Sequence, residues 1–168
     1  MKNKIHFSFN QKLLFISLAL FLGGCMRSNM RPINSLNEAI FLFSSSYREP
    51  SLGTNWLATL SNADGKDKIE MIDIRSRRRI LLPGLNRADS QPISVSVSAN
   101  GKRLAIVRQR EDKTELLLYR RNLGTVQRIE LNPKGIPRRV SLDALGKVLA
   151  VQVSRGGKWD VEVIRLKD

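Results

Sequence analysis

Residues 98–106 read Ser-Ala-Asn-Gly-Lys-Arg-Leu-Ala-Ile, and this stretch decides the fold. The residues before it, 92–98, alternate apolar and polar side chains, which is the pattern of a half-buried strand. Asn100-Gly101 between two such runs is a strong hairpin signal, because a tight turn needs residues that tolerate positive φ. The stretch therefore predicts two antiparallel strands joined at this turn.

The same design returns 45 residues later, where Gly101-Lys102 falls on Gly146-Lys147 and residues 104–106 fall on 149–151. A looser copy begins near Trp56. Four short strands in a repeat of about 40 to 45 residues are typical of a β-propeller blade. The other strand-like runs of the three copies are residues 68–74, 79–82, 115–119, 126–131 and 159–164.

Residues 98–106 resemble the repeat of TolB-type propellers, which reads Ser-Pro-Asp-Gly-Lys, any residue, Ile or Leu, Ala and an apolar residue. Ala99 and Asn100 stand where the family has Pro and Asp. The last copy, residues 143–147, keeps only Gly-Lys of the motif, and the first keeps little beyond Asp64-Gly65-Lys66. The resemblance covers residues 56–168 and implies an all-β fold of four-stranded antiparallel blades. It says little about function, because propellers host many roles.

The TolB propeller closes a ring of six blades, whereas residues 56–168 accommodate about two and a half to three blades at the observed repeat. We therefore expect a partial β-propeller with exposed sheet edges. Three arrangements remain open. The blades stand as an open stack, several chains close a ring by oligomerisation, or the sheet is completed on a partner.

The N-terminus has the features of a secretory signal peptide. Its first twelve residues carry three lysines, and residues 13–22 are an uncharged run that is too short to span a bilayer. Leu22-Gly23-Gly24-Cys25 then resembles the lipobox of bacterial lipoproteins. The resemblance implies cleavage between Gly24 and Cys25, a diacylglycerol on the thiol and an acylated new amine. Two or more acyl chains hold a protein firmly at a membrane. The alternative is an uncleaved signal anchor followed by a free thiol.

Three segments follow from these patterns: a lipoprotein signal peptide over 1–24, a lipidated tether with a short helical segment over 25–55, and propeller blades over 56–168. Ser35 and Glu38 have the spacing of a capping box, so we expect a short helix over about 36–43. Residues 44–55 are expected to form a loop by composition.

The chain is strongly basic, with a formal charge of +14 from 29 Lys and Arg against 15 Asp and Glu. The first 24 residues hold three lysines and no acid, so a form that begins at Cys25 carries 26 − 15 = +11. Such a charge favours anionic surfaces. Two interpretations of the basic clusters remain open: docking to acidic lipid head groups, acidic glycans or a protein, and a solvated surface that is basic without a partner. The candidate patch consists of Arg75, Arg77, Arg78, Arg79, Arg108, Arg110, Arg120, Arg121, Arg138 and Arg139.

The sequence argues against catalysis, because its one histidine, His6, lies in the segment expected to be removed. The closely spaced acids Asp64, Asp67, Glu70 and Asp73 match no calcium loop. We therefore expect no catalytic residue, no metal site and no cofactor. Trp56 and Trp159 are expected in the blade cores, and few aromatics accompany the basic clusters, which disfavours nucleic acid.

These observations favour a non-enzymatic, lipid-anchored protein of the bacterial cell envelope that faces the periplasm and acts as a protein-binding scaffold or adaptor. Its membrane contact would be the acyl chains on Cys25. The TolB resemblance implies a partner in the Tol–Pal system. Two alternatives come from other classes: a basic nucleic-acid-binding protein with an N-terminal anchor, and a carboxylate-dependent hydrolase.

The mass of the N-terminal peptide tests this interpretation. Protein purified from its native membrane should yield a peptide that begins at Cys25 and carries acyl chains, as measured by mass spectrometry. An intact Met1 with a free thiol would contradict the anchor and return attention to nucleic acid.

Overall fold

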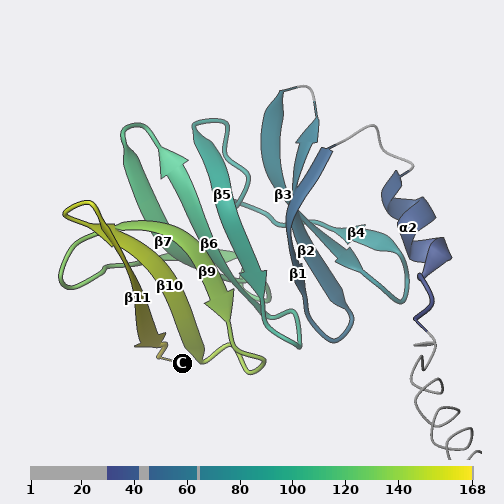
Figure 1. The fold of residues 1–168 in the computed structure, drawn as a ribbon. Coiled ribbons are helices and arrows are strands. Elements are labelled where there is room, and N and C mark those ends of the chain that lie inside the picture. The colour runs from purple at the N-terminus through teal and green to yellow at the C-terminus, as the bar shows by residue number, and fades with distance from the viewer. Residues whose placement is uncertain (1–29, 42–45, 64, 168) are drawn as a thin grey trace, which may run out of the picture. The chain divides into compact units, whose positions relative to one another are not determined.

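The computed structural model describes residues 30–41, 46–63 and 65–167, so Gly24 and Cys25 lie outside the described residues (Figure 1). The chain divides into two units, Met1–Ile33 and Asn34–Asp168, and the second contains the strands. It begins with helix α2 (Asn34–Phe41). In the described part of the chain, no helix has the length and apolar character needed to cross a membrane.

Three antiparallel sheets follow one another along the chain, and in each the spatial order of the strands is their sequence order. The chain is a partial β-propeller with two four-stranded blades and a third blade of three strands, which confirms the expected fold class. The first blade contains β1 (Ser46–Leu52), β2 (Trp56–Ala63), β3 (Lys66–Asp73) and β4 (Arg78–Ile80). The second contains β5 (Ser90–Val97), β6 (Arg103–Arg110), β7 (Lys113–Arg120) and β8 (Thr125–Ile129). The third contains β9 (Ile136–Leu142), β10 (Val148–Arg155) and β11 (Lys158–Arg165).

The loop expected over residues 44–55 is wrong for residues 46–52, which form β1. The alternation of the strand is hidden in the sequence because the pairing of β1 with β2 shifts register between Arg48 and Ser51. Glu49 occupies this bulge with a φ of 53°. The first blade therefore begins at Ser46 rather than Trp56, and the turn at Gly65 joins β2 to β3 instead of matching the turn at Gly101.

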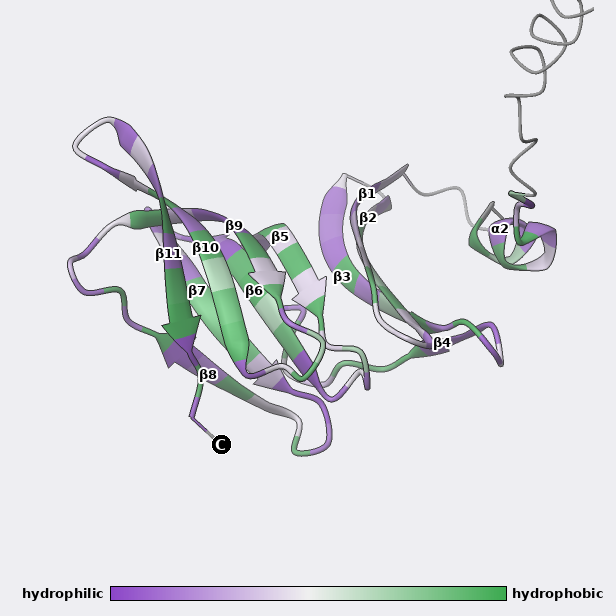
Figure 2. Ribbon diagram, turned by 60° about the horizontal axis from the view of Figure 1, so that its bottom comes forward, coloured by the Kyte–Doolittle hydropathy of each residue, from purple (hydrophilic) through white to green (hydrophobic). Residues whose placement is uncertain are grey.

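The middle blade is buried on both faces. Leu104 and Ile106 of β6 point into a core shared with the first blade, whereas Ala105 and Val107 point into a core shared with the third blade. All four side chains are fully buried. Neighbouring residues of a strand point to opposite faces, so a strand covered on both sides needs a continuous apolar run. Figure 2 shows this hydrophobic colouring on the strands and hydrophilic colouring on many of the turns.

The first strand of each blade, which we call the leading strand, contacts the leading strand of the next blade through serine hydroxyls. The Oγ of Ser51 in β1 accepts a hydrogen bond from the N–H of Val97 in β5, at 3.0 Å. The Oγ of Ser96 in β5 accepts one from the N–H of Leu142 in β9, at 2.9 Å. Ser51 and Ser96 are 45 residues apart, so the same device is repeated at both blade junctions.

Substitution of Ser96 by Ala should lower the free energy of unfolding by about 1–3 kcal/mol, because it leaves the N–H of Leu142 without its acceptor. Ser141 is the matched control, since it lies 45 residues further on and is exposed. Ser141→Ala should change the free energy by less than about 0.5 kcal/mol. Urea denaturation followed by circular dichroism measures both, and equal effects would contradict the role given to Ser96.

Candidate binding surfaces

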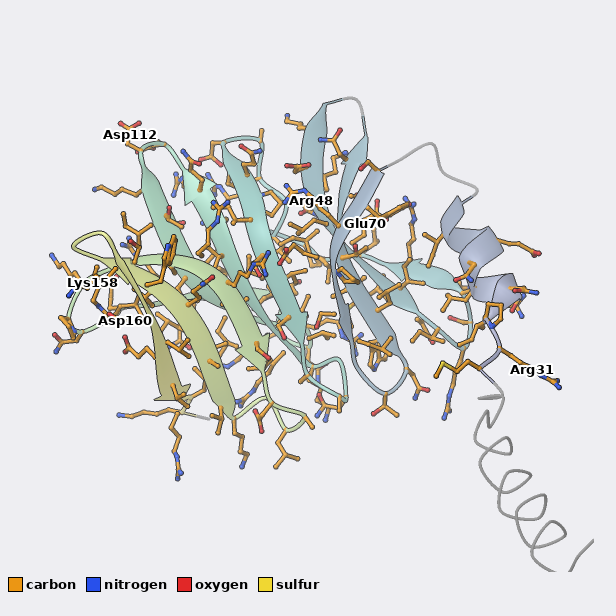
Figure 3. All side chains as sticks on the ribbon, viewed as in Figure 1. Arg31, Arg48, Glu70, Asp112, Lys158 and Asp160 are labelled. Carbon is orange, nitrogen blue, oxygen red and sulfur yellow. The ribbon has the colours of Figure 1, made fainter. Side chains whose placement is uncertain are left out.

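The turns that join the strands lie on two opposite sides of the blades. One side, here called the lower face, comprises residues 52–56, 73–78, 98–103, 120–125, 143–148 and 165–167. The other side, the upper face, comprises the described residues among 62–67, 81–90, 110–113, 130–136 and 155–158. Asp112, labelled in Figure 3, lies at the turn between β6 and β7 on the upper face.

Backbone hydrogen bonds join the turns of the lower face into one surface. The N–H of Thr54 donates to the carbonyl of Ala99, and the N–H of Ala99 donates to the carbonyl of Ala144, both at 2.9 Å. These bonds connect all three blades. Within the second and third blades, Arg121 and Leu166 donate to the carbonyls of Lys102 and Lys147. The side chains of these turns therefore share one continuous surface.

The two faces differ in charge. The upper face has seven described basic residues and five acidic ones, a difference of +2. The lower face has ten basic residues and two acids, Asp73 and Asp143, a difference of +8. The ten are Arg75, Arg77, Arg78, Lys102, Arg103, Arg120, Arg121, Lys147, Arg165 and Lys167.

Both acids of the lower face are engaged in their own turns. Asp143 Oδ1 accepts hydrogen bonds from the N–H groups of Val148 at 2.7 Å and Lys147 at 2.6 Å, and these lower the pKa of the Asp143 carboxyl. The pKa of Asp73 is lowered first by the side chain of Ser76 and then by the backbone N–H of Arg75. Their charges are therefore directed into the backbone of the turns.

Trp56 holds an arginine on this face. The guanidinium of Arg121 lies 4.5 Å from the centre of the Trp56 ring, and its Nε donates to the carbonyl of Gly101 at 2.7 Å. Gly101 has a φ of 66°, and a Cβ there would lie 2.6 Å from the Trp56 ring. The close packing explains why the turn needs glycine. Trp56 packs against the core between the first two blades, as expected.

The ten arginines expected to form a patch lie in several places. Arg75, Arg77, Arg78, Arg120 and Arg121 belong to the lower face, and Arg79 on β4 pairs with Glu70 at 3.2 Å. Arg110 is held by Asp89 and Arg108 by Glu115, while Arg138 and Arg139 lie on β9. The structure thus brings only half of them together on one face.

Arg108 is a structural residue rather than a docking group. It is buried, and its Nε lies 2.8 Å from a carboxylate oxygen of Glu115. Asp89 likewise lies between Arg87 and Arg110, which hold its pKa well below the usual range. Arg108 and Arg110 are two residues apart on β6, so their side chains lie on the same face of the sheet. At Arg108 this face is covered by the protein.

Five basic residues of the lower face were not expected: Lys102, Arg103, Lys147, Arg165 and Lys167. Lys147, Arg165 and Lys167 have no basic neighbour in the sequence, so a search for basic runs misses them, and a search for arginine pairs also misses the adjacent Lys102 and Arg103. The repeated Gly-Lys at 101–102 and 146–147 could have identified two of them, because equivalent turns of successive blades lie on the same face.

The acids between residues 64 and 73 do not converge. Asp67 accepts a hydrogen bond from Asn62, and Glu70 accepts one from Ser61. Asp73 is the last residue of β3, and Asp64 lies outside the described residues. Among the residues that the structure describes, no three Asp, Glu, His or Cys gather as metal ligands.

A second surface is the outward face of the third blade. Leu149, Val151 and Val153 of β10 face the second blade, so the alternate residues of the sheet face outward. On β11 these outward residues include Trp159, Val161 and Val163, which are 58%, 71% and 67% exposed. The expectation that Trp159 lies in a blade core is therefore wrong, because the face it belongs to is uncovered.

The equivalent face of the second blade is buried. Val161 and Val163 lie 45 residues beyond Leu116 and Leu118, each of which is only 2% exposed. On the outward face of the first blade, Thr59, Ser61 and Ile72 are also buried, whereas Leu52 at the end of β1 is exposed. Of the three blades, the third alone has this large apolar exposure on its outward face in the described part of the chain.

Comparison with protein-family models finds no match, and comparison with curated proteins finds none either. Among solved structures, the chain is similar to TolB from Acinetobacter baumannii, with a TM-score of 0.55 and 20% identity over 70% of this chain and 29% of that one. It is also similar to the β-propeller domain of the Trilobed protease from Pyrococcus furiosus, with a TM-score of 0.54 and 16% identity over 72% of this chain and 39% of that one. The chain thus spans less than two fifths of either protein and has a TolB-like β-propeller fold.

Substitution of Asp143 by Ala should lower the melting temperature at neutral pH, because the backbone N–H groups of Leu145, Lys147 and Val148 lose their acceptor. The folded pKa of Asp143 is lowered, so its stabilisation is complete above the unfolded value of about 4 and is lost as pH falls through the folded pKa. The difference between wild type and variant should therefore be full at pH 5 to 7 and shrink below about pH 4. Thermal unfolding at each pH measures it, with the exposed Asp160→Ala as control; a difference that persists at low pH would contradict this explanation.

Proposed function

We propose that the chain is a non-enzymatic, lipid-anchored protein of the bacterial cell envelope that binds a partner protein through the outward face of its third blade. The observation that carries this proposal is the contrast between equivalent positions. Leu116 and Leu118 are covered by a neighbouring blade, whereas Val161 and Val163, at the equivalent positions of the next repeat, are exposed. The third blade has the apolar face of an interface, and a partner would supply the surface that covers it.

The charges of this face indicate what kind of partner fits. Arg139, Gln152 and Val161 lie opposite one another across β9, β10 and β11, and Arg165 lies at the end of the same face. Its described ionisable groups are thus arginines, of which Arg139 also lies 3.8 Å from a carboxylate oxygen of Glu49 on β1. An apolar sheet or strand edged with carboxylates would complement it, because it would bury the valines and pair with the arginines.

A second copy of the chain fits this face less well. Two third blades packed face to face would bring Arg139 and Arg165 of each copy into one interface, where like charges repel. A head-to-tail contact would need the outward face of the first blade, but Thr59 and Ile72 on that face are already buried. We therefore expect a different protein as the occupant.

The envelope location rests on the sequence of residues 1–25, which has the order of a lipoprotein signal and lipidation site. The similarity of the fold to TolB supports a role near the Tol–Pal system. The chain matches only part of the TolB chain, so a different envelope partner is the alternative. Similarity to the propeller domain of a protease concerns the fold and supplies no catalytic group to this chain. The sequence has no histidine after His6 for a Ser–His or Cys–His nucleophile pair. Asp67 and Glu70 of β3 are engaged by Asn62 and Ser61. Both observations support a binding role.

Photo-crosslinking in living cells tests the proposed interface. A crosslinking residue at Val161 should form an adduct with another envelope protein, whereas the same residue at Val126, on the outer strand of the second blade, should not. The purified partner should bind the wild-type chain, and Trp159→Ala with Val163→Asp should weaken its Kd by at least about tenfold. An adduct between two copies, or equal adducts at both positions, would contradict the proposal.

A further inference from the structure

The lower face combines basic residues with exposed leucines at its turns. We propose that this face docks on the anionic phospholipid headgroups of a membrane. The inference goes beyond the proposed protein interface, which lies on the outward face of the third blade and shares Arg165 with the lower face. The choice of a membrane over other polyanions rests on the lipid anchor in the proposed function.

The charge of the face is the first support. Its described residues carry a net +8 from turns of all three blades, whereas the described residues of the upper face carry +2. The two lower acids, Asp73 and Asp143, accept hydrogen bonds within their turns. A surface with one dominant sign of charge attracts anionic lipid, and the long stems of Lys and Arg let their charged ends reach headgroups at different heights.

The exposed leucines are the second and independent support. Leu52, Leu123 and Leu145 lie at three separate turns of the lower face and are 72%, 70% and 71% exposed. An apolar side chain at a turn tip can enter the boundary between headgroups and acyl chains while the adjacent basic residues bind phosphate. Exposed leucines among basic residues are thus the surface that a membrane interface would require.

The third blade end of the face combines both features in one groove. Apolar and basic groups converge there with one acid, Asp143, whose carboxylate accepts backbone N–H groups of its own turn. The lining residues are Asp143, Leu145, Lys147, Val148, Arg165, Leu166 and Lys167. A phospholipid headgroup has a phosphate next to an apolar glycerol backbone, and this groove offers groups for each.

Nucleic acid fits the lower face less well. Binding to single strands uses aromatic rings on which bases stack. Trp56 is the aromatic residue among the lower-face residues defined above, and its ring is covered by Arg121 and packed on Gly101. The three exposed leucines would make no favourable contact with nucleic-acid phosphates, whereas each of them could bury apolar surface in a bilayer.

Lysine footprinting of the full chain tests the proposal. The protein is reconstituted in nanodiscs of phosphatidylcholine alone or with about 30% phosphatidylglycerol, and the rate of lysine acetylation is read by mass spectrometry. Anionic lipid should slow acetylation of Lys102 and Lys167 at least about threefold, and about 0.5 M salt should remove most of this protection. Lys113 and Lys134 on the upper face serve as internal controls and should react equally in both nanodiscs.

Two sets of variants separate charge from insertion. Lys102→Glu with Lys167→Glu should abolish binding of the chain to phosphatidylglycerol vesicles in a flotation assay, whereas Lys113→Glu with Lys134→Glu makes the same change of charge on the upper face and should retain it. Leu123→Ser with Leu145→Ser should weaken flotation several-fold at high salt, where the apolar contribution is the larger one. Circular dichroism confirms that each variant is folded.

Equal acetylation of Lys102 in both nanodiscs, or equal loss of flotation in the two charge-reversal variants, would overturn the proposal. The wild-type chain is also mixed with a double-stranded DNA probe in a gel-shift assay. A shift of this probe without flotation on anionic vesicles would identify nucleic acid as the ligand of the face instead. The mass of the N-terminal peptide is measured on the same sample. An unmodified terminus with retained flotation would refute the anchor and leave the docking face standing.

Discussion

The fold depends on one interaction that is made at each blade junction. The leading strands β1, β5 and β9 belong to separate sheets, so no β-ladder connects them. A serine hydroxyl on one leading strand accepts the N–H of the next, from Ser51 to Val97 and from Ser96 to Leu142. Because an unpaired buried N–H is costly, these bonds fix the offset between blades. A fixed offset places equivalent turns side by side, and the basic lower face is the result.

The sequence predicted those strands whose alternation and turns are regular, which are most of the second and third blades. It missed β1 because the bulge at Glu49 interrupts the alternation. The sequence alone also did not show why the last copy of the motif, residues 143–147, departs from the pattern. In that copy Asp143 replaces two hydrogen-bond acceptors of the second blade. In the second blade Ser98 accepts the N–H of Arg103 and Asn100 accepts the N–H of Lys102. In the third blade one carboxylate oxygen of Asp143 accepts both equivalent N–H groups.

The binding surfaces were harder to predict than the strands, because proximity in sequence is a poor guide to proximity on a face. Arg108 and Arg110 stand in a basic run, yet each is held by a carboxylate away from the lower face. Lys102 and Lys147 are far apart in the chain and yet share that face. The exposure of Trp159 was also hidden, since its strand pattern matches that of a covered blade and only the number of blades decides whether it is covered.

The contrast between the first and third blades gives the stack of blades a direction. On its first outward face Thr59, Ser61 and Ile72 are buried, whereas Val161 and Val163 on its last one are exposed. Repeating contacts that join unlike faces produce open filaments when both faces are available. The described part of the first outward face offers no row of exposed apolar residues to match the valines, so these valines do not by themselves lead to polymerisation.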